Sequence, residues 1–158
     1  MDSYLDEMDL KSDIEKTNDE IKRLDHLILV SLKYTRTGDM LKEVVENLIE
    51  TYEWIILILL EYLVDTKNIE EKPISVKKRC STIKENIKLE GIGEHIDLYL
   101  RMRKLLKTDY QRINEYRRHV TMKGIVEDKE MVINIDLVTE YYEEIKELFK
   151  KVKALVQK

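Results

Sequence analysis

The stretch WIILILLEYLV, which covers Trp54–Val64, decides the fold expected for this chain. Seven apolar residues run together from Trp54 to Leu60, and Glu61 is the one charge before Val64. A helix that is apolar on nearly all sides is buried between neighbours, so we expect the remaining helices to pack around it. The run is shorter than the about 20 apolar residues of a membrane-spanning helix, so no membrane association is expected.

The composition predicts one soluble, all-α domain over residues 1–158. Of the 158 residues, 43% are hydrophobic and 38% are charged, which suits a single domain with a core and a charged surface. With 4 Gly and 1 Pro, turns are few and elements are long. No stretch sustains the apolar–polar alternation of a strand. We therefore expect an antiparallel five-helix bundle in which the second helix is central.

Apolar periodicity predicts helices over approximately residues 12–34, 40–65, 76–90, 94–124 and 136–155. Residues 1–9 are expected to be a frayed lead-in, and Ser12 or Asp13 to cap the first helix. Gly38 is expected to end the first helix in a left-handed conformation, with Asp39 capping the second. Asp136 is the expected cap of the fifth helix, and residues 131–133 can form a brief extended piece.

Several classes of site have no support in the sequence. Cys80 is the one cysteine, which excludes an intramolecular disulfide, and its helical spacing predicts a small core residue. Three His are scattered without metal-ligand spacing, so no metal or cofactor is expected. The acidic N-terminus does not resemble a signal peptide, and we expect a cytoplasmic protein. Abundant Lys, Glu and Ile suggest a thermophilic source.

Charge is distributed unevenly along the chain. Residues 101–123 hold eight basic and two acidic residues, a charge of +6, although the whole chain carries −4. This asymmetry can focus an anionic ligand on one face, or acidic helices packed beside the basic one can neutralise it. The predicted third helix also has a basic outer face. Such a face is usually only solvated, but it could help to bind an anion if it lies near the basic fourth helix. The residues expected to contact nucleic acid are Arg103, Lys104, Lys107, Arg117 and Arg118.

Arg112 and His119 form the one constellation that suggests chemistry. If both lie on the fourth helix, their separation of seven residues places them on one face, because seven steps make about two turns. An imidazole can act as a general acid or base near neutral pH. A guanidinium can hold a phosphate and stabilise the charge of its transition state. Together they could cleave RNA without a metal by activating the 2′-hydroxyl.

The segment Arg112-Ile-Asn-Glu-Tyr-Arg-Arg-His119 resembles the Arg-x(4–6)-His motif of the HEPN domains, which are helical bundles of about this length. The resemblance covers the C-terminal third, and Ile113 stands where the commonest motif has a polar residue. It implies a metal-independent ribonuclease that acts as a homodimer, with Arg112 and His119 as the catalytic pair. Other HEPN proteins bind RNA or pair with a small nucleotidyltransferase in toxin–antitoxin systems, which would make such an antitoxin the protein partner.

A second hypothesis belongs to a different class. The lack of a strong catalytic motif, together with long amphipathic helices, also suits a non-catalytic helical scaffold or a subunit of a nucleoprotein or multiprotein assembly. A dimer is implied by the resemblance, and Tyr116 and Tyr141 are candidate exposed aromatics for its interface.

Overall fold

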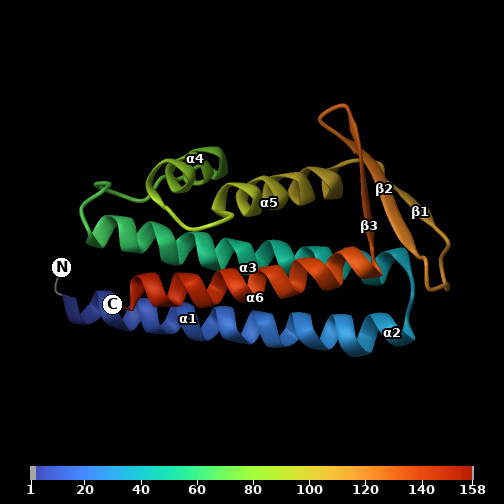
Figure 1. The fold of residues 1–158 in the computed structure, drawn as a ribbon, viewed down its shortest axis with the longest axis horizontal. Helices are drawn as coiled ribbons and strands as arrows, with labels where there is room; N and C mark the ends of the chain where they lie inside the picture. The colour runs from blue at the N-terminus through green and yellow to red at the C-terminus, as the bar shows by residue number, and fades with distance from the viewer. Residues whose placement is uncertain (1–2, 158) are drawn as a thin grey trace.

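The computed structural model describes the backbone of residues 3–157 and the side chains of residues 10–157. Helical elements are α1 (Ser3–His26), a π-helical segment (Leu27–Ser31), α2 (Leu32–Tyr34), α3 (Gly38–Asp65), α4 (Val76–Asn86), α5 (Ile92–Lys107) and α6 (Ile135–Val156). Three strands lie between α5 and α6, namely β1 (Gln111–Ile113), β2 (Thr121–Val126) and β3 (Lys129–Asn134). The chain is thus mostly helical with a small sheet (Figure 1).

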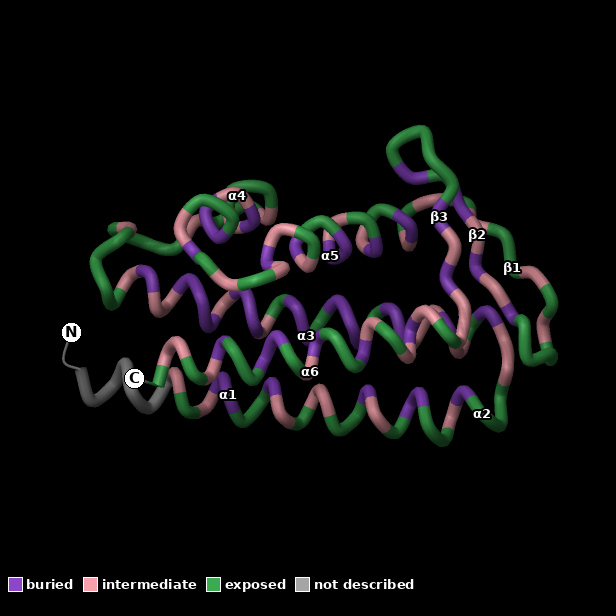
Figure 2. Tube along the Cα trace, in the orientation of Figure 1, coloured by how far each residue is buried: buried purple, intermediate pink, exposed green. Residues whose placement is uncertain are grey.

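The apolar helix α3 contacts more of the molecule than any other element. Along one side it packs against α1 and α6, and it also contacts α4, α5 and strand β2. In Figure 1 the long helices α1, α3 and α6 run lengthwise beside one another, while α4 and α5 lie on the other side of α3. Leu48, Ile58, Leu59 and Leu60 are fully buried, and Figure 2 shows the buried positions concentrated along this helix. Its apolar run therefore contributes to the core.

The expectation of an exclusively helical fold is wrong between residues 108 and 134. The predicted fourth helix over 94–124 ends at Lys107, and the chain continues as the antiparallel sheet β1-β2-β3. Met122, Gly124 and Val126 are buried at every second position of β2, as are Met131 and Ile133 in β3. This period of two is the strand pattern, and the buried face of β2 contacts α3 and α5. The expected extended piece at 131–133 is confirmed.

Turn geometry explains why the helix does not continue. Glu127 and Asp128 both have positive φ, 53° and 65°, and join the paired residues Val126 and Lys129. A two-residue connection with two positive φ values matches the right-handed twist of a hairpin. Gly124 allows close packing, because an added Cβ would stand 2.7 Å from Leu105 Cδ1. The sheet therefore lies tightly against the end of α5.

Helix boundaries agree with the sequence better than helix caps do. The first helical stretch ends at Tyr34 and α3 ends at Asp65, as predicted. The first helix begins at Ser3, earlier than the predicted start near residue 12, so Ser12 and Asp13 do not cap it, and residues 1–2 lie outside the described part. Thr37, not Asp39, caps α3 through a bond from the Met40 N–H, and Asn134, not Asp136, caps α6 through the Leu137 N–H.

Gly38 is helical and does not have the left-handed conformation expected for it. Cys80 is buried, as expected, with 3% of its surface exposed. None of the helices in the described residues combines the length and apolar character that crossing a membrane requires.

Candidate nucleic-acid interface

A basic groove lies between α4 and α5. It has a volume of about 540 Å³, and no acidic side chain is among its lining residues. Its cations come from both helices: Lys77, Lys84, Arg103, Lys104 and Lys107. The basic outer face of the third predicted helix therefore does lie near a second basic helix. Leu100 and Val76 provide apolar surface between the charges.

Three of the five cations in this basic groove have acidic partners at its edges. Arg103 contacts Glu53 at 3.0 Å and the hydroxyl of Tyr99 at 3.1 Å. Lys84 pairs with Asp97, and Lys104 pairs with Glu127. Lys77 and Lys107 form no ion pair with the side chains of residues 10–157. Internal neutralisation is thus partial, and two ammonium groups remain available to an anion.

A second basic region lies where the β1–β2 connection meets the corner between α2 and α3. Arg112, in β1, lies with its guanidinium 2.7 Å from the Asp39 carboxylate and 5.8 Å from the ring centre of Tyr110. Its stem packs on Gly38, where an added Cβ would come within 2.6 Å of Arg112 Cγ. A hydrogen bond to Tyr110 and then the charge of Asp39 raise the pKa of Arg112. These contacts attach β1 to the start of α3.

The β1–β2 connection is fixed to the same corner by two further bonds. Glu115 Oε1 accepts the N–H of Gly38 at 3.1 Å, which satisfies a donor at the N-terminus of α3. The N–H of Tyr116 donates to the carbonyl of Arg36 at 2.6 Å. Asn114 and Tyr116 have positive φ, 57° and 67°, so the connection makes sharp turns that a helix excludes. We name Lys33–Asp39 together with Tyr110–His119 the tyrosine corner.

His119 and Arg112 do not share a helix face, so the geometric argument made from their spacing is wrong. His119 is exposed and immediately precedes Val120 and β2, and its carbonyl accepts the Thr121 hydroxyl at 2.8 Å. Arg112 is opposite Met122 in the sheet register. Of the other predicted contacts, Arg118 pairs with Asp136 at 2.6 Å, and Arg117 is exposed without an ion pair among residues 10–157.

Two tyrosines give the tyrosine corner its aromatic character. Tyr34 and Tyr116 are each 79% exposed, more than any other aromatic side chain of residues 10–157. The bond from Tyr116 to Arg36 brings the second tyrosine close to the segment that follows the first. Tyr116 was expected to be exposed, and this is confirmed. Tyr141, expected to be exposed as well, is partly buried.

Sequence reasoning missed Tyr34 because the helical stripe of the first helix ends there and gives no reason to single it out. The bond between Tyr116 and Arg36, which brings residues 110–119 to the end of α2, forms only because residues 108–124 are not helical. Lys77 and Lys84 were noticed as a basic helix face, but only the packing of α4 beside α5 brings them next to Lys107.

Within the described residues, no group of three or more His, Cys, Asp or Glu side chains is arranged to hold a metal ion.

Comparison of the chain with family models, curated proteins and solved structures found no match. The functional argument therefore rests on the geometry of this chain.

Proposed function

We propose that the protein binds single-stranded RNA. The observation that carries the proposal is the basic groove between α4 and α5, in which cations of two helices face a hollow without acidic lining residues. Lysine and arginine in a groove attract the phosphate backbone, and this term dominates affinity for nucleic acids. The chain is acidic overall, so the attraction is local and does not coat the whole surface.

The tyrosine corner supports a single strand over a duplex. Bases that are free of pairing stack on exposed aromatic rings, and such stacking tolerates any sequence. Tyr34 and Tyr116 present rings of this kind, and Arg117 and His119 follow Tyr116 closely in the sequence. Lys107, at the end of α5, leads through residues 108–110 directly into β1, so one short segment connects the groove with the corner.

The test is the salt dependence of binding to a fluorescent single-stranded RNA, measured by anisotropy. We expect Lys77→Gln and Lys107→Gln each to weaken binding and to reduce the slope of log affinity against log salt by about 0.7. The matched control is Lys150→Gln, because Lys150 lies on α6 in a pair with Glu147. Equal weakening by all three variants would show that RNA does not use the groove.

Catalysis remains a separate part of the proposal. Cleavage through Arg112 and His119, the HEPN relationship, a homodimer and an antitoxin partner are all predictions from the resemblance. The exposed imidazole of His119, which follows Arg117 and Arg118 in the sequence, supports an acid–base role, whereas the contacts of Arg112 with Asp39 and Gly38 support a positioning role for the arginine. RNA binding without cleavage would favour the non-catalytic scaffold.

A further inference from the structure

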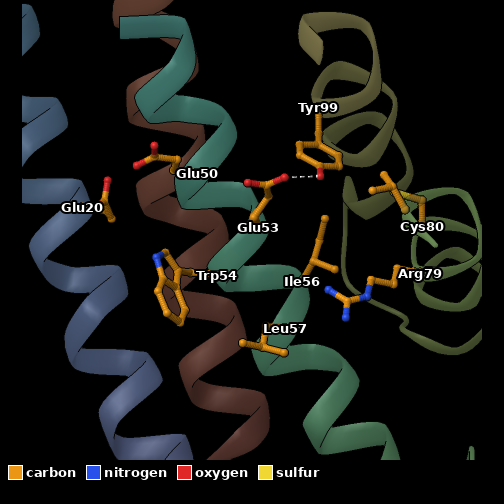
Figure 3. Close-up of a pocket in the computed structure, with 10 residues that line it drawn as sticks. Glu20, Glu50, Glu53, Trp54, Ile56, Leu57, Arg79, Cys80 and Tyr99 are labelled. Atoms are coloured by element: carbon orange, nitrogen blue, oxygen red, sulfur yellow. Dashed lines mark hydrogen bonds between the residues drawn. The ribbon is translucent and has the colours of Figure 1, made fainter. Parts of the chain in front are cut away.

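A line of carboxylates runs along α3, beside α1 at Glu50 and beside α5 at Glu53. Glu43, Glu46, Glu50 and Glu53 follow one another at intervals of three, four and three residues, which places them on one stripe of the helix. At 1.5 Å per residue the line is about 15 Å long. Glu20 of α1 joins it from the other side of the seam, and Figure 3 shows Glu20 and Glu50 on facing sides of α1 and α3.

The line is hollowed over its whole length. One hollow of about 440 Å³ has Glu43, Glu46 and Glu50 among its lining residues. The next, of about 550 Å³, has Glu20, Glu50 and Glu53. Because Glu50 lines both, the two hollows meet at its side chain. We name the two together the acidic groove.

A buried amide in the floor of the acidic groove lacks a partner. Asn47 is 4% exposed and lines the smaller hollow, and neither its Nδ2 nor its Oδ1 has a hydrogen-bond partner in the structure. Buried polar atoms are normally satisfied, and leaving one unpaired costs about 1–3 kcal/mol. This amide is therefore an independent indication that a polar ligand occupies the hollow.

The charges of the acidic groove call for a cation at its centre. Arg23 lies 3.9 Å from Glu43, and Arg103 binds Glu53, so both ends of the line are partly neutralised. Glu46 and Glu50 form no ion pair with the side chains of residues 10–157. Burial, and next the charge of Glu50, raise the pKa of Glu20. The charge of Arg23 opposes this shift, and Lys42 and Arg79 also line the two hollows. Neither Glu20 nor Glu50, which face each other across the seam, forms an ion pair with the side chains of residues 10–157.

Apolar and aromatic surface continues the acidic groove beyond its charges. Trp54 and Leu57 line the larger hollow, and Figure 3 shows the Trp54 ring below Glu20 and Glu50. The Trp54 ring already accepts an ammonium group of this chain, since Lys16 Nζ lies 5.0 Å from its centre. A ligand with several ammonium groups joined by methylene chains would match both the line of carboxylates and this surface.

We infer that the acidic groove along α3, which α1 borders on one side and α4 and α5 border on the other, binds a linear aliphatic polyamine. Its ammonium groups pair with Glu46, Glu50 and Glu20, and one of them donates to the carbonyl oxygen of Asn47. The smaller hollow also has Asp39, the partner of Arg112, among its lining residues, but Glu50 and Asn47 do not contact Arg112. The inference does not depend on the proposed RNA binding.

Isothermal titration calorimetry with spermidine tests the inference. We expect saturable one-to-one binding that Glu50→Gln weakens at least tenfold and Asn47→Leu weakens measurably, while Glu140→Gln, an exposed carboxylate on α6, leaves it unchanged. RNA binding should be the same in Glu50→Gln as in the wild type, which separates this site from the proposed function.

Three results would overturn the inference. Equal loss in Glu50→Gln and Glu140→Gln would mean diffuse attraction to an acidic surface. Binding of Mg²⁺ that is as tight as that of spermidine and equally sensitive to Glu50→Gln would mean a divalent-cation site. A lack of heat and of any shift in melting temperature with spermidine would mean that the groove does not take a polyamine.

Discussion

Arg112 in the short strand β1 and Asp39 in the first turn of α3 form an ion pair at 2.7 Å, although the sequence separates them by most of three helices. The carboxylate lies near the positive end of the α3 dipole, and Cγ and Cδ of Arg112 lie over the backbone at Gly38. The pair therefore joins the sheet to the helical part of the molecule. It gives Arg112 a structural role that holds whether or not the residue contacts RNA.

Gly38→Ala should release this junction. An added Cβ would stand 2.6 Å from Cγ of Arg112, an atom near the backbone that cannot easily move away. We expect a lower melting temperature and faster amide exchange in residues 112–119. Gly93→Ala is the control, because nothing lies within 4 Å of its Cβ and a helical alanine is favoured over glycine by about 0.5–1 kcal/mol. Equal stability of the two variants would contradict the role given to the junction.

Tyr116→Ala and Tyr34→Ala should each weaken binding of single-stranded RNA. Loss of one stacked base costs about 1–3 kcal/mol, which corresponds to roughly 5- to 150-fold in affinity. Tyr116→Phe keeps the ring and should bind nearly as well as the wild type. Ile74→Ala removes another exposed apolar side chain, 94% exposed, and should have no effect. Anisotropy titrations at one salt concentration are sufficient, and unchanged affinity in both alanine variants would argue against stacking.

His119→Ala should abolish RNA cleavage, if the protein cleaves RNA, without changing the fold. The side chain is exposed, so its removal leaves no cavity, while loss of general acid–base catalysis costs about 10²–10⁴-fold in rate. Gel assays with EDTA present compare the wild type, His119→Ala and the exposed His26→Ala as control. Cleavage that persists in His119→Ala, or that is missing from the wild type, removes the catalytic interpretation.

Stability should fall as pH rises through the range in which Glu61 ionises. Burial, and next a hydrogen bond with Asp13 of α1, raise the pKa of Glu61 from its ordinary 4.5 to about 7. Between these values the folded chain holds a proton that the unfolded chain has released, so each rise in pH favours unfolding. Lys72, 3.5 Å away, opposes this shift without cancelling it.

Urea unfolding of Glu61→Gln measures the effect. The free energy of unfolding of this variant minus that of the wild type should be about 1–3 kcal/mol larger at pH 8 than at pH 5, given about 1.4 kcal/mol per pKa unit. Glu71→Gln, an exposed neighbour in the following loop, should show no such difference between the two pH values. If Glu61→Gln differs from the wild type by the same free energy of unfolding at both pH values, the pKa of Glu61 is not raised in the folded protein.

Leu105 and Leu106 are adjacent but should differ in their contribution to stability. Leu105 is fully buried and packs under Gly124 of β2, whereas Leu106 is only partly buried. Leu105→Ala should cost about 2–5 kcal/mol and Leu106→Ala clearly less, because the cost grows with the cavity that remains. Thermal unfolding of both variants gives the comparison. A larger loss of stability for Leu106→Ala would contradict the packing of Leu105, and not Leu106, against the sheet.

The sequence predicts the helices well because each has an apolar stripe or, in α3, an apolar run long enough to exceed the length of a strand. It fails after Lys107 because the strands are short and their turns lack the usual residues. Residues Glu127 and Asp128 form a two-residue hairpin turn, for which Asn-Gly or Asp-Gly is the usual sequence signal, and neither is present here. Arg112, Tyr116 and His119 also have spacings that fit a helix, so periodicity alone cannot reveal the sheet.

The basic groove and the tyrosine corner were harder to predict than the helices, because both depend on tertiary contacts. The basic residues of α4 and α5 were visible in the sequence, but their meeting in one groove is a result of packing. The tyrosine corner joins residues 33–39 to residues 110–119 through Tyr116 and Arg36, and no local pattern contains that bond. Sequence reasoning therefore identified most of the cations and missed their arrangement.

The position of α6 has a consequence for how the chain reaches this fold. Helix α6 packs against both α3 and α1, and Ile145, Leu148 and Val152 on its inner side are buried. During synthesis from the N-terminus, α3 is complete long before residue 135 leaves the ribosome, so one apolar flank of α3 stays uncovered in the nascent chain. Such transient exposure favours aggregation. Translation that stalls within the β2–β3 hairpin should therefore yield a product that depends on chaperones until α6 is added.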